Sequence, residues 1–426
     1  MKLAVIGGGS TYTPELADGL GRLAPWLTEL VLVDPDEGRL ALVGPVSARI
    51  MRRHGHPAAV RWTTDADDGL DGAAAVLIQL RVGGQAARNR DESWPLDFCC
   101  VGQETTGAGG LAKALRTVPL VLRIAERARQ RALPGAWLID FTNPVGMVTR
   151  ALLDAGHRAV GLCNVAIGFQ RYFAALLGVP PESVALDHVG LNHLTWERAA
   201  LVDGTDRLPE LLASRREEIA ARVEMPPAVL DQVGGVPSYY LRYYYFHDEV
   251  TAGQRQAGTR AAAVAAIEAE LLRLYADPAL DRKPELLGQR GGAFYSEAAV
   301  ALLAALLNDT GLSDTGTTSR GDTQVLNLRN RGTFGFLPDE AVIEVPAVIG
   351  PDGPHPAPAA PLPPLLRGLT AHLAAYEELA VDAALRGGRP RVTAALLAHP
   401  LVGQHDLAER MADRLIAENE RFLAWA

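Results

Sequence analysis

A short apolar run that ends in consecutive glycines opens the chain, and it constrains the fold more than any other sequence feature. Residues 2–6 form this run, Gly7 to Gly9 and Ser10 follow it, and a helical pattern starts at about Thr13. Pro14 suits the first turn of such a helix. A strand, a glycine-rich turn and a helix in this order are typical of the first unit of a parallel sheet that holds a ligand at its carboxyl edge.

Apolar strands and helical patterns continue to alternate up to residue 164. Strands are expected at residues 30–33, 60–63, 75–80, 137–141 and 159–162, and helices at 37–54, 115–131 and 145–153. Apolar strands separated by helices are typical of parallel sheets that are covered on both faces. We therefore predict an α/β fold whose N-terminal domain, residues 1–164, is a doubly wound parallel sheet of the Rossmann type.

The alternation ends after this point, and residues 165–426 are predicted to form a second domain of the α+β class. Strands are expected at residues 184–189 and 194–202, and helices at 168–177, 208–223, 261–275, 296–307, 365–385 and 407–425. A proline-rich stretch at residues 346–364 has apolar residues on both sides. We expect it to be an ordered crossing of the surface instead of a flexible linker.

Charge and cysteine content exclude several classes of protein. The 426 residues carry 41 basic and 50 acidic side chains, a net charge of −9, without long blocks of like charge. A nucleic acid or a membrane is therefore not expected as a partner. Three cysteines do not make a disulfide framework, and no apolar run reaches the roughly 18 residues of a membrane span. Since no signal peptide is recognisable, we expect the cytoplasm as the compartment.

The glycine loop and Asp34 together indicate a dinucleotide site. The glycines allow a tight turn and the close approach of a pyrophosphate to the helix N-terminus. Asp34 ends the second strand, where a carboxylate binds ribose hydroxyls and repels a 2′-phosphate, which favours NAD over NADP. The alternatives are a turn without a ligand and a capping aspartate, and Tyr12 replaces the third glycine of the fingerprint. The candidate NAD-binding residues are Gly7, Gly9, Ser10, Thr11, Asp34 and Arg39.

Cys163 and His193 form a candidate metal site. Cys163 follows the sixth strand at the carboxyl edge of the sheet, and His193 lies in a turn between two later strands. Thiolate and imidazole suit a divalent transition metal, and two protein ligands leave the site open for catalysis. Taken singly, such a cysteine is more often a core residue and such a histidine an ordinary loop residue. His188 is a nearby competitor for the same role.

A tyrosine-rich segment and an arginine-rich segment offer further candidates. Residues 237–245 contain five tyrosines, which either form an aromatic packing face or include one general base. A nearby cation would lower the pKa of that phenol. Arg81, Arg88 and Arg90 surround a glycine pair after a strand, a suitable place for an anion clamp, although most arginines are simply solvated.

The chain resembles glycoside hydrolase family 4, the NAD- and metal-dependent group, and within it the 6-phospho-β-glucosidases. The matching segments lie in order over nearly the whole chain. They are residues 7–16 (GGGSTYTPEL), 81–92, 102–119 (GQETTGAGGLAKALRTVP), 141–146 (FTNPVG), 161–164 (GLCN), 190–196 (GLNHLTW), 237–245, 290–297 and 399–402. One departure is Val165-Ala166, where the family pattern has Val-Pro.

The resemblance implies a fold akin to that of lactate and malate dehydrogenases. It implies NAD at the glycine loop and Asp34, and Mn²⁺ or another divalent metal at Cys163 and His193. Tyr240 matches the base that removes the C2 proton of the sugar, and Tyr239 is the neighbour with which it can be confused.

The resemblance also implies a substrate, a small phosphorylated sugar glycoside, and a homodimeric or homotetrameric assembly. Arg88 and Arg290 would meet the phosphate, and Asn143, Asn164 and Glu104 would contact the sugar or a metal-bound water. Asn164 fits the β-type, since α-type members carry Asp there. The implied reaction is hydrolysis of 6-phospho-β-glucosides through transient oxidation at C3, loss of the C2 proton, elimination of the aglycone and addition of water.

Three other functions stay open from the sequence alone. One is a family 4 glycosidase that acts on α-linked or non-phosphorylated substrates. Another is a hydroxy-acid dehydrogenase, which would need a His–Asp pair and an arginine for the acid, a set that we do not find at suitable positions. The third is a catalytically silent NAD-binding protein, which would have no need of Cys163, His193 and Tyr240 together.

Overall fold

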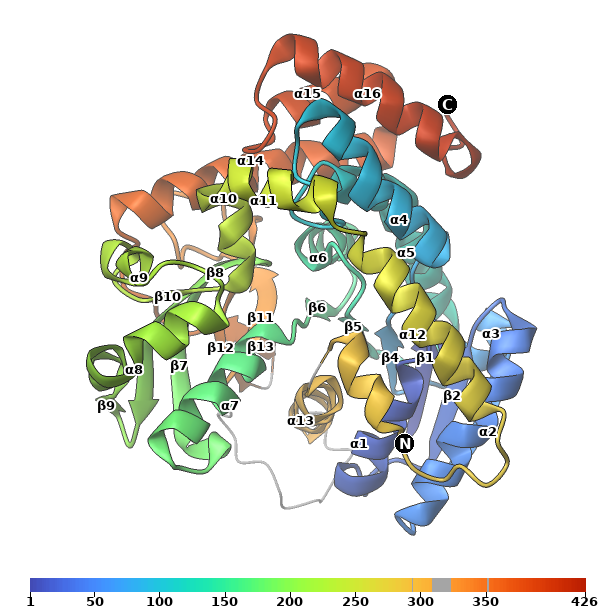
Figure 1. Cartoon of the computed structure of the whole chain (residues 1–426). Coiled ribbons are helices and arrows are strands. Elements are labelled where there is room, and N and C mark those ends of the chain that lie inside the picture. Colours follow the sequence, from blue (N-terminus) through green and yellow to red (C-terminus); the bar gives the residue numbers. More distant parts are fainter. Residues whose placement is uncertain (293, 309–322, 351) are drawn as a thin grey trace.

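The computed structural model describes residues 1–292, 294–308, 323–350 and 352–426. These residues build a nine-stranded sheet and a smaller antiparallel sheet, and helices surround both (Figure 1). Among the described helices, none combines the length and the apolar character needed to cross a membrane.

The first six strands form the parallel part of the large sheet, in the order β3-β2-β1-β4-β5-β6. They are β1 (Lys2–Ile6), β2 (Glu29–Val33), β3 (Ala59–Thr63), β4 (Ala75–Ile78), β5 (Trp137–Asp140) and β6 (Ala159–Gly161). The order reverses between β1 and β4, and such a reversal opens a binding crevice at the carboxyl ends of the strands. This arrangement confirms the predicted Rossmann-type doubly wound sheet.

The connecting helices cover both faces of this sheet. They are α1 (Thr13–Leu23), α2 (Glu37–Arg53), α3 (Ala66–Leu70), α4 (Gly84–Ser93), η1 (Trp94–Phe98), α5 (Gly109–Arg131) and α6 (Val145–Asp154). Because parallel crossovers are right-handed, α1 and α2 lie on one face, and α3, α5 and α6 lie on the other. The helix α4, which carries Arg88, was not expected from the sequence because it has few apolar residues to mark a periodic face.

Three antiparallel strands from the second half of the chain extend the sheet beyond β6. They are β11 (Thr323–Arg329), β12 (Val342–Gly350) and β13 (Gly353–Pro356), and Asn327 of β11 pairs with Gly161 of β6. The expectation of a surface crossing at residues 346–364 was therefore wrong for its first part, which lies in β12 and β13. The large sheet is continuous across the predicted division at residue 164, and that division stays a prediction.

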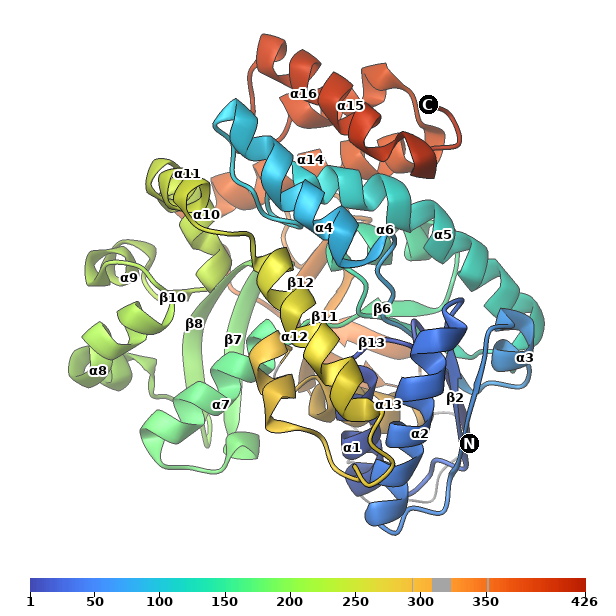
Figure 2. The same ribbon diagram turned by 45° about the vertical axis from the view of Figure 1, so that its right-hand side comes forward.

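The smaller sheet carries the turn that contains His193. Its strands are β7 (Val184–Leu191), β8 (Leu194–Val202), β9 (Thr205–Asp206) and β10 (Val236–Pro237). It lies beside α7 (Val165–Leu177), α8 (Leu208–Arg222) and α9 (Pro227–Val233), on the left of both views (Figure 2). The residues that follow Cys163 therefore lead directly from the large sheet into this region.

The remaining helices pack around the two sheets. They are η2 (Pro181–Ser183), η3 (Tyr239–Leu241), α10 (Arg242–Tyr245), α11 (His247–Gln256), α12 (Arg260–Tyr275), η4 (Glu285–Arg290), α13 (Tyr295–Asn308), α14 (Pro364–Arg386), α15 (Arg389–Leu397), α16 (His405–Asn419) and η5 (Glu420–Phe422). The last helix ends at Asn419, earlier than the predicted residue 425, and a short 3₁₀ turn follows it. Helices α15 and α16 pack together at the top of Figure 1, and α14 packs against α15 and α5.

Candidate functional site

The glycine loop lies at the carboxyl end of β1 and contacts Asp34. Gly7 has a φ of 85°, and a Cβ there would lie 2.8 Å from the carbonyl oxygen of Gln79. The backbone N–H of Gly9 donates to the Asp34 carboxylate at 3.0 Å, and Arg39 donates to the carbonyl oxygen of Gly9 at 2.8 Å. Burial raises the pKa of Asp34 above its ordinary value, although hydrogen bonds from the backbone N–H groups of Asp36 and Gly9 oppose the shift. The structure thus brings Gly7, Gly9, Asp34 and Arg39 together.

The helix that follows the loop begins without a side-chain cap. Tyr12 occupies the N-cap position of α1 and makes no capping hydrogen bond. Ser10 and Thr11 precede it. The Thr11 hydroxyl is buried and has no hydrogen-bond partner among the described residues. An uncapped helix N-terminus beside a glycine loop is a suitable place for the pyrophosphate of a dinucleotide, so these residues fit NAD.

Cys163 and His193 come from different sheets, and Asn192 connects them. Cys163 follows β6, and the side chain of Asn192 hydrogen-bonds its thiol. Burial raises the pKa of this thiol. His193 lies in the turn between β7 and β8 with a φ of 63°, a left-handed conformation that is uncommon for a residue other than glycine. Burial lowers the pKa of His193 to about 4, so its imidazole is neutral at pH 7, the form that binds metals.

This pair can bind a metal only as an open site. No group of three or more His, Cys, Asp or Glu side chains in the described part of the chain is arranged to hold a metal ion. A cation at Cys163 and His193 would therefore take its other ligands from water or substrate. The side-chain oxygen of Asn143, after β5, is buried and has no hydrogen-bond partner among the described residues. An unpaired acceptor of this kind fits a site completed by a ligand.

His188, the competing histidine, is fully engaged elsewhere. Its Nδ1 lies 2.6 Å from Glu197, and its Nε2 lies 3.1 Å from Glu344. These two carboxylates outweigh the effect of burial and raise the pKa of His188 to about 10. Glu344 also accepts a hydrogen bond from Asn192 at 2.8 Å. His188 therefore supports the turn that carries His193 and has no ring nitrogen left for a metal.

Tyr240 lies against His193, whereas Tyr239 points elsewhere. The rings of Tyr240 and His193 are stacked with their centroids 3.7 Å apart. Burial raises the pKa of Tyr240, and the nearby Cys163 adds to the shift. Tyr239 is 36% exposed, and its hydroxyl accepts a hydrogen bond from Arg242 at 2.9 Å. Of the two tyrosines, Tyr240 is therefore the one placed beside the candidate metal ligand.

Glu104 lies in a cluster of basic side chains at the carboxyl edge of the large sheet. Its carboxylate pairs with Arg81, with Arg88 at 3.0 Å and with Lys113 at 2.6 Å. These cations hold the pKa of Glu104 well below its ordinary value despite complete burial. Burial and the neighbouring Arg81 lower the pKa of Lys113 to about 7. The predicted residues Arg88 and Glu104 are thus in direct contact, and Lys113 is a member of the site that the sequence did not reveal.

Arg290 is held by a second acidic residue that the sequence did not reveal. Its guanidinium donates to Glu268 at 2.9 and 3.1 Å, and Arg39 lies 3.8 Å from the same carboxylate. Glu268 is buried on α12 in line with apolar residues at helical spacing, Ala261, Val264, Leu271 and Tyr275. An acidic residue within an otherwise apolar stripe is the signal that identifies such a position. Glu268 therefore links the candidate phosphate ligand Arg290 to the cofactor loop.

The last predicted residue, Asn164, directly follows Cys163. It occupies the N-cap position of α7 without a side-chain capping bond.

His193 also lines a small cavity of about 20 Å³, room for about one water molecule. Its lining residues are Thr105, Thr106, Pro144, Met147, Asn192, His193, Tyr244, Leu373, Tyr376 and Glu377.

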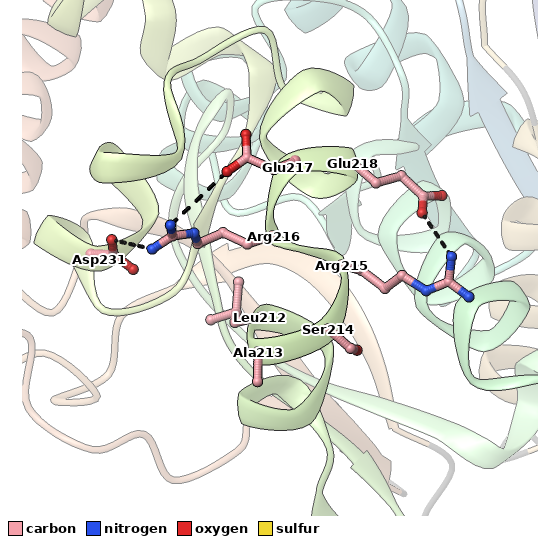
Figure 3. A pocket seen from close by; sticks show the side chains of 8 residues that line it. All are labelled: Leu212, Ala213, Ser214, Arg215, Arg216, Glu217, Glu218 and Asp231. Carbon is pink, nitrogen blue, oxygen red and sulfur yellow. Dashed lines mark hydrogen bonds and ion pairs between the residues drawn. The ribbon is translucent and has the colours of Figure 1, made fainter.

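A surface depression lies on α8, and none of the candidate residues lines it. Its charged side chains pair with one another, Arg215 with Glu218 and Arg216 with Asp231 (Figure 3). The ion pairs at this depression are exposed to solvent, and exposed ion pairs contribute little to stability. The candidate functional site therefore remains the one at the carboxyl edge of the large sheet and at the β7–β8 turn.

Comparisons with known proteins match nearly the whole chain. The model for "Family 4 glycosyl hydrolase" matches residues 2–179, and that for the "Family 4 glycosyl hydrolase C-terminal domain" matches residues 188–402. The probable 6-phospho-β-glucosidase of Bacillus subtilis is 36% identical over 99% of this chain and 97% of its own length. The 6-phospho-β-glucosidase of Escherichia coli is 33% identical, with 99% of this chain and 96% of the relative covered.

Solved structures agree with these relatives. The 6-phospho-β-glucosidase of Thermotoga maritima, solved with manganese, NAD⁺ and glucose-6-phosphate, is 30% identical, with a TM-score of 0.90 and 99% of each chain covered. Malate dehydrogenase from Salinibacter ruber shares the fold alone, with 16% identity, a TM-score of 0.54, and 91% of this chain and 98% of that chain covered. Both family models and both relatives show that this chain belongs to glycoside hydrolase family 4.

Proposed function

We propose that the protein is a 6-phospho-β-glucosidase that depends on NAD and on a divalent metal, with Mn²⁺ as the first choice. The observation that carries this proposal is the stacking of Tyr240 on His193, which joins the candidate base to the candidate metal ligand. The relatives in Bacillus subtilis, Escherichia coli and Thermotoga maritima support the substrate class, because all three are named 6-phospho-β-glucosidases.

The cofactors would occupy the two candidate sites described above. The glycine loop, Asp34 and Arg39 would hold NAD, and Cys163 and His193 would hold the metal. When bound, NAD supplies a hydride acceptor and donor for C3 of the sugar, and the cation supplies stabilisation for negative charge that develops next to it. Asp34 would orient the ribose through its carboxylate, which already accepts the Gly9 N–H.

Tyr240 would remove the proton from C2 of the sugar. A ketone at C3 makes this proton acidic, and loss of the proton allows the aglycone to leave from C1. Water then adds at C1, and C3 returns to the alcohol. Burial raises the pKa of Tyr240, so a nearby cation is needed to make the phenol an effective base. No pair of catalytic carboxylates is required for this route.

Arg88 and Arg290 would bind the 6-phosphate, since guanidinium groups match phosphate oxygens in charge and geometry. Both side chains are held in place by buried acids, Arg88 by Glu104 and Arg290 by Glu268. Asn143, with its unpaired oxygen, and Asn164 would contact the sugar hydroxyls or the metal-bound water. Asn164 at this position favours β-linked over α-linked substrates.

A panel of 4-nitrophenyl glycosides tests this proposal. The panel contains α- and β-glucosides with and without a 6-phosphate, assayed with NAD and Mn²⁺ and after removal of each. We expect turnover of the 6-phospho-β-glucoside only when both cofactors are present, without net accumulation of NADH. Cys163→Ser should lose both Mn²⁺ binding and turnover. Turnover of the phosphorylated substrate in a chelated, NAD-stripped preparation, or net NADH formation, would contradict the proposal.

A further inference from the structure

We propose that Gln103 and Thr105 are positioning residues that fix the tautomer of His193, with the proton on Nδ1 and the free lone pair on Nε2. This inference deepens the proposed function, because it rests on His193 as a metal ligand. Among the described residues, neither side chain forms a hydrogen bond with Tyr240 or with the glycine loop. Their role is argued from the direction of the hydrogen bonds between three side chains.

The first step is the orientation of the Gln103 amide. Its Oε1 accepts hydrogen bonds from the backbone N–H of Thr105 at 2.6 Å and from the backbone N–H of Thr106. A backbone N–H can only donate, so the atom that faces it must be the amide oxygen and not the amide nitrogen. The backbone therefore settles which way the Gln103 side chain points.

The second step is the direction of the Thr105 hydroxyl. Its Oγ1 lies 2.9 Å from the same Gln103 oxygen and 2.9 Å from Nδ1 of His193. The Gln103 oxygen has no proton to give, so the single hydroxyl proton of Thr105 must point toward it. The Thr105 oxygen can then only accept from His193. Nδ1 of His193 therefore carries a proton.

The third step is the state of the other ring nitrogen. A histidine binds a metal ion as the neutral imidazole, which carries a single ring proton. A neutral imidazole with a proton on Nδ1 has an unprotonated Nε2. Nε2 makes no hydrogen bond to any described residue, so its lone pair is available to a ligand. The opposite tautomer would set two lone pairs against each other across the 2.9 Å contact with Thr105.

The arrangement also fixes the plane of the ring. The Thr105 hydroxyl holds one edge of the imidazole, and the Tyr240 ring covers one face. Metal-binding histidines gain affinity and orientation when the second nitrogen donates to a fixed acceptor. Gln103 is itself held in place, because its backbone carbonyl oxygen accepts a hydrogen bond from the N–H of Gly107 at 3.2 Å and closes the loop. The loop of residues 103–107 thus positions a side chain of the β7–β8 turn.

Thr105 and Thr106 offer a matched pair of variants. Both line the same small cavity, but the Thr106 hydroxyl has no hydrogen-bond partner among the described residues. We would measure Mn²⁺ binding to the full-length protein in the presence of NAD by isothermal titration calorimetry. Thr105→Val should weaken Mn²⁺ binding by about 10- to 100-fold, the usual effect of removing such a partner. Thr105→Ser keeps the hydroxyl and should bind Mn²⁺ as tightly as the unchanged protein. Thr106→Val should also keep the Mn²⁺ affinity of the unchanged protein.

A second readout reports the tautomer directly. Long-range ¹H–¹⁵N spectra of the metal-free protein distinguish a protonated Nδ1 from a protonated Nε2, and His193→Gln assigns the signal. We expect a protonated Nδ1 in the unchanged protein and in Thr105→Ser. A protonated Nε2 in the unchanged protein would overturn the inference, as would equal Mn²⁺ affinities for Thr105→Val and Thr106→Val. NAD affinity, which should stay unchanged, checks that each variant is folded.

Cys163→Ser separates this inference from the proposed function. Loss of Mn²⁺ binding in Cys163→Ser, together with an unaffected Thr105→Val, would leave the metal site standing and refute only the role of Gln103 and Thr105. Unchanged Mn²⁺ binding in Cys163→Ser would refute the metal site itself and the positioning role with it.

Discussion

The imidazole ring of His193 lies parallel to the phenol ring of Tyr240, with the planes 5° apart and the centroids separated by 3.7 Å. The two residues reach this contact from different elements, the β7–β8 turn and η3. A cation bound by His193 would therefore be close enough to the phenol to lower its pKa, which burial raises. Because of this contact, the basicity of Tyr240 would depend on the metal bound at His193.

Replacing Tyr240 by Phe tests its role as the base. The variant keeps the ring that stacks on His193 and loses only the hydroxyl. We expect kcat to fall by about 10²- to 10⁴-fold, the usual contribution of a general base. The melting temperature and the NAD affinity should change little. Exchange of the C2 hydrogen of the substrate into deuterated water should be lost with the activity.

Tyr239→Phe is the matched control, because Tyr239 is partly exposed and its hydroxyl bonds Arg242. We expect near-normal turnover and C2 exchange in this variant. If Tyr239→Phe lost both and Tyr240→Phe kept both, the base would be Tyr239. If neither variant lost activity, the elimination route would be wrong for this enzyme.

Asp34 should determine which dinucleotide binds. Asp34→Ala removes the acceptor of the Gly9 N–H and the negative charge near the ribose. We expect NAD affinity to fall by about 10- to 100-fold, as for the loss of a hydrogen bond to a charged group. Discrimination against NADP should relax at the same time. Fluorescence titration with both cofactors measures this, and an unchanged ratio of the two dissociation constants would refute the assignment.

Two arginines on α4 allow a controlled test of phosphate binding. Arg88 is 13% exposed and contacts Glu104, whereas Arg90 is 34% exposed and lies 3.8 Å from Glu418. Arg88→Met should lower kcat/KM for the 6-phosphorylated substrate by about 10- to 100-fold through the loss of charged hydrogen bonds. Arg90→Met should have little effect. Equal losses for the two variants would show that the phosphate binds elsewhere.

The stability of the protein should depend on the pH through Glu377. Burial raises the pKa of this carboxyl from 4.5 to about 8. The folded chain then keeps a proton that the unfolded chain releases. The free energy of unfolding should therefore fall as the pH rises through this interval, by an amount on the order of a few kcal/mol.

Glu377→Gln should remove this pH dependence, since the amide stays neutral. Urea unfolding at about pH 5 and at about pH 8 measures the effect, and the variant should gain stability relative to the unchanged protein at the higher pH. Glu378→Gln is the control, because that neighbouring side chain is 57% exposed. A parallel loss of stability with pH in both variants would exclude Glu377 as the cause.

The parallel half of the fold was predictable because its sequence signals are local. Strands β1, β2, β4, β5 and β6 are short apolar runs, and helices α1, α2, α5 and α6 have periodic apolar patterns, whereas α4 has few apolar residues and was not expected. Strands β11 to β13 were not predictable in the same way. Pro346 lies within β12, and because proline cannot donate to a neighbouring strand, its presence in the sequence suggests a loop. It lies opposite Val325 of β11, and pairing with β11 on one side and β13 on the other makes the segment part of a sheet.

Site residues whose type alone indicates a role could be predicted from the sequence. Site residues whose role depends on a contact with a residue far away in the chain could not. Cysteine, histidine and tyrosine indicate ligands and bases by their type alone. Glu268 and Lys113 appear in the sequence as ordinary helix residues. Their importance comes from the arginine or carboxylate that the fold places beside them, Arg290 for Glu268 and Glu104 for Lys113.

The pairing of β6 with β11 also has a consequence for synthesis on the ribosome. Gly161 leaves the ribosome long before Asn327, its partner across the sheet. Until then the nascent chain presents an unpaired strand edge, which is a template for pairing with other chains. A product that terminates before residue 323 would keep this open edge permanently. We expect such truncated chains to aggregate, and overexpression to favour soluble protein when translation is slow enough to keep their concentration low.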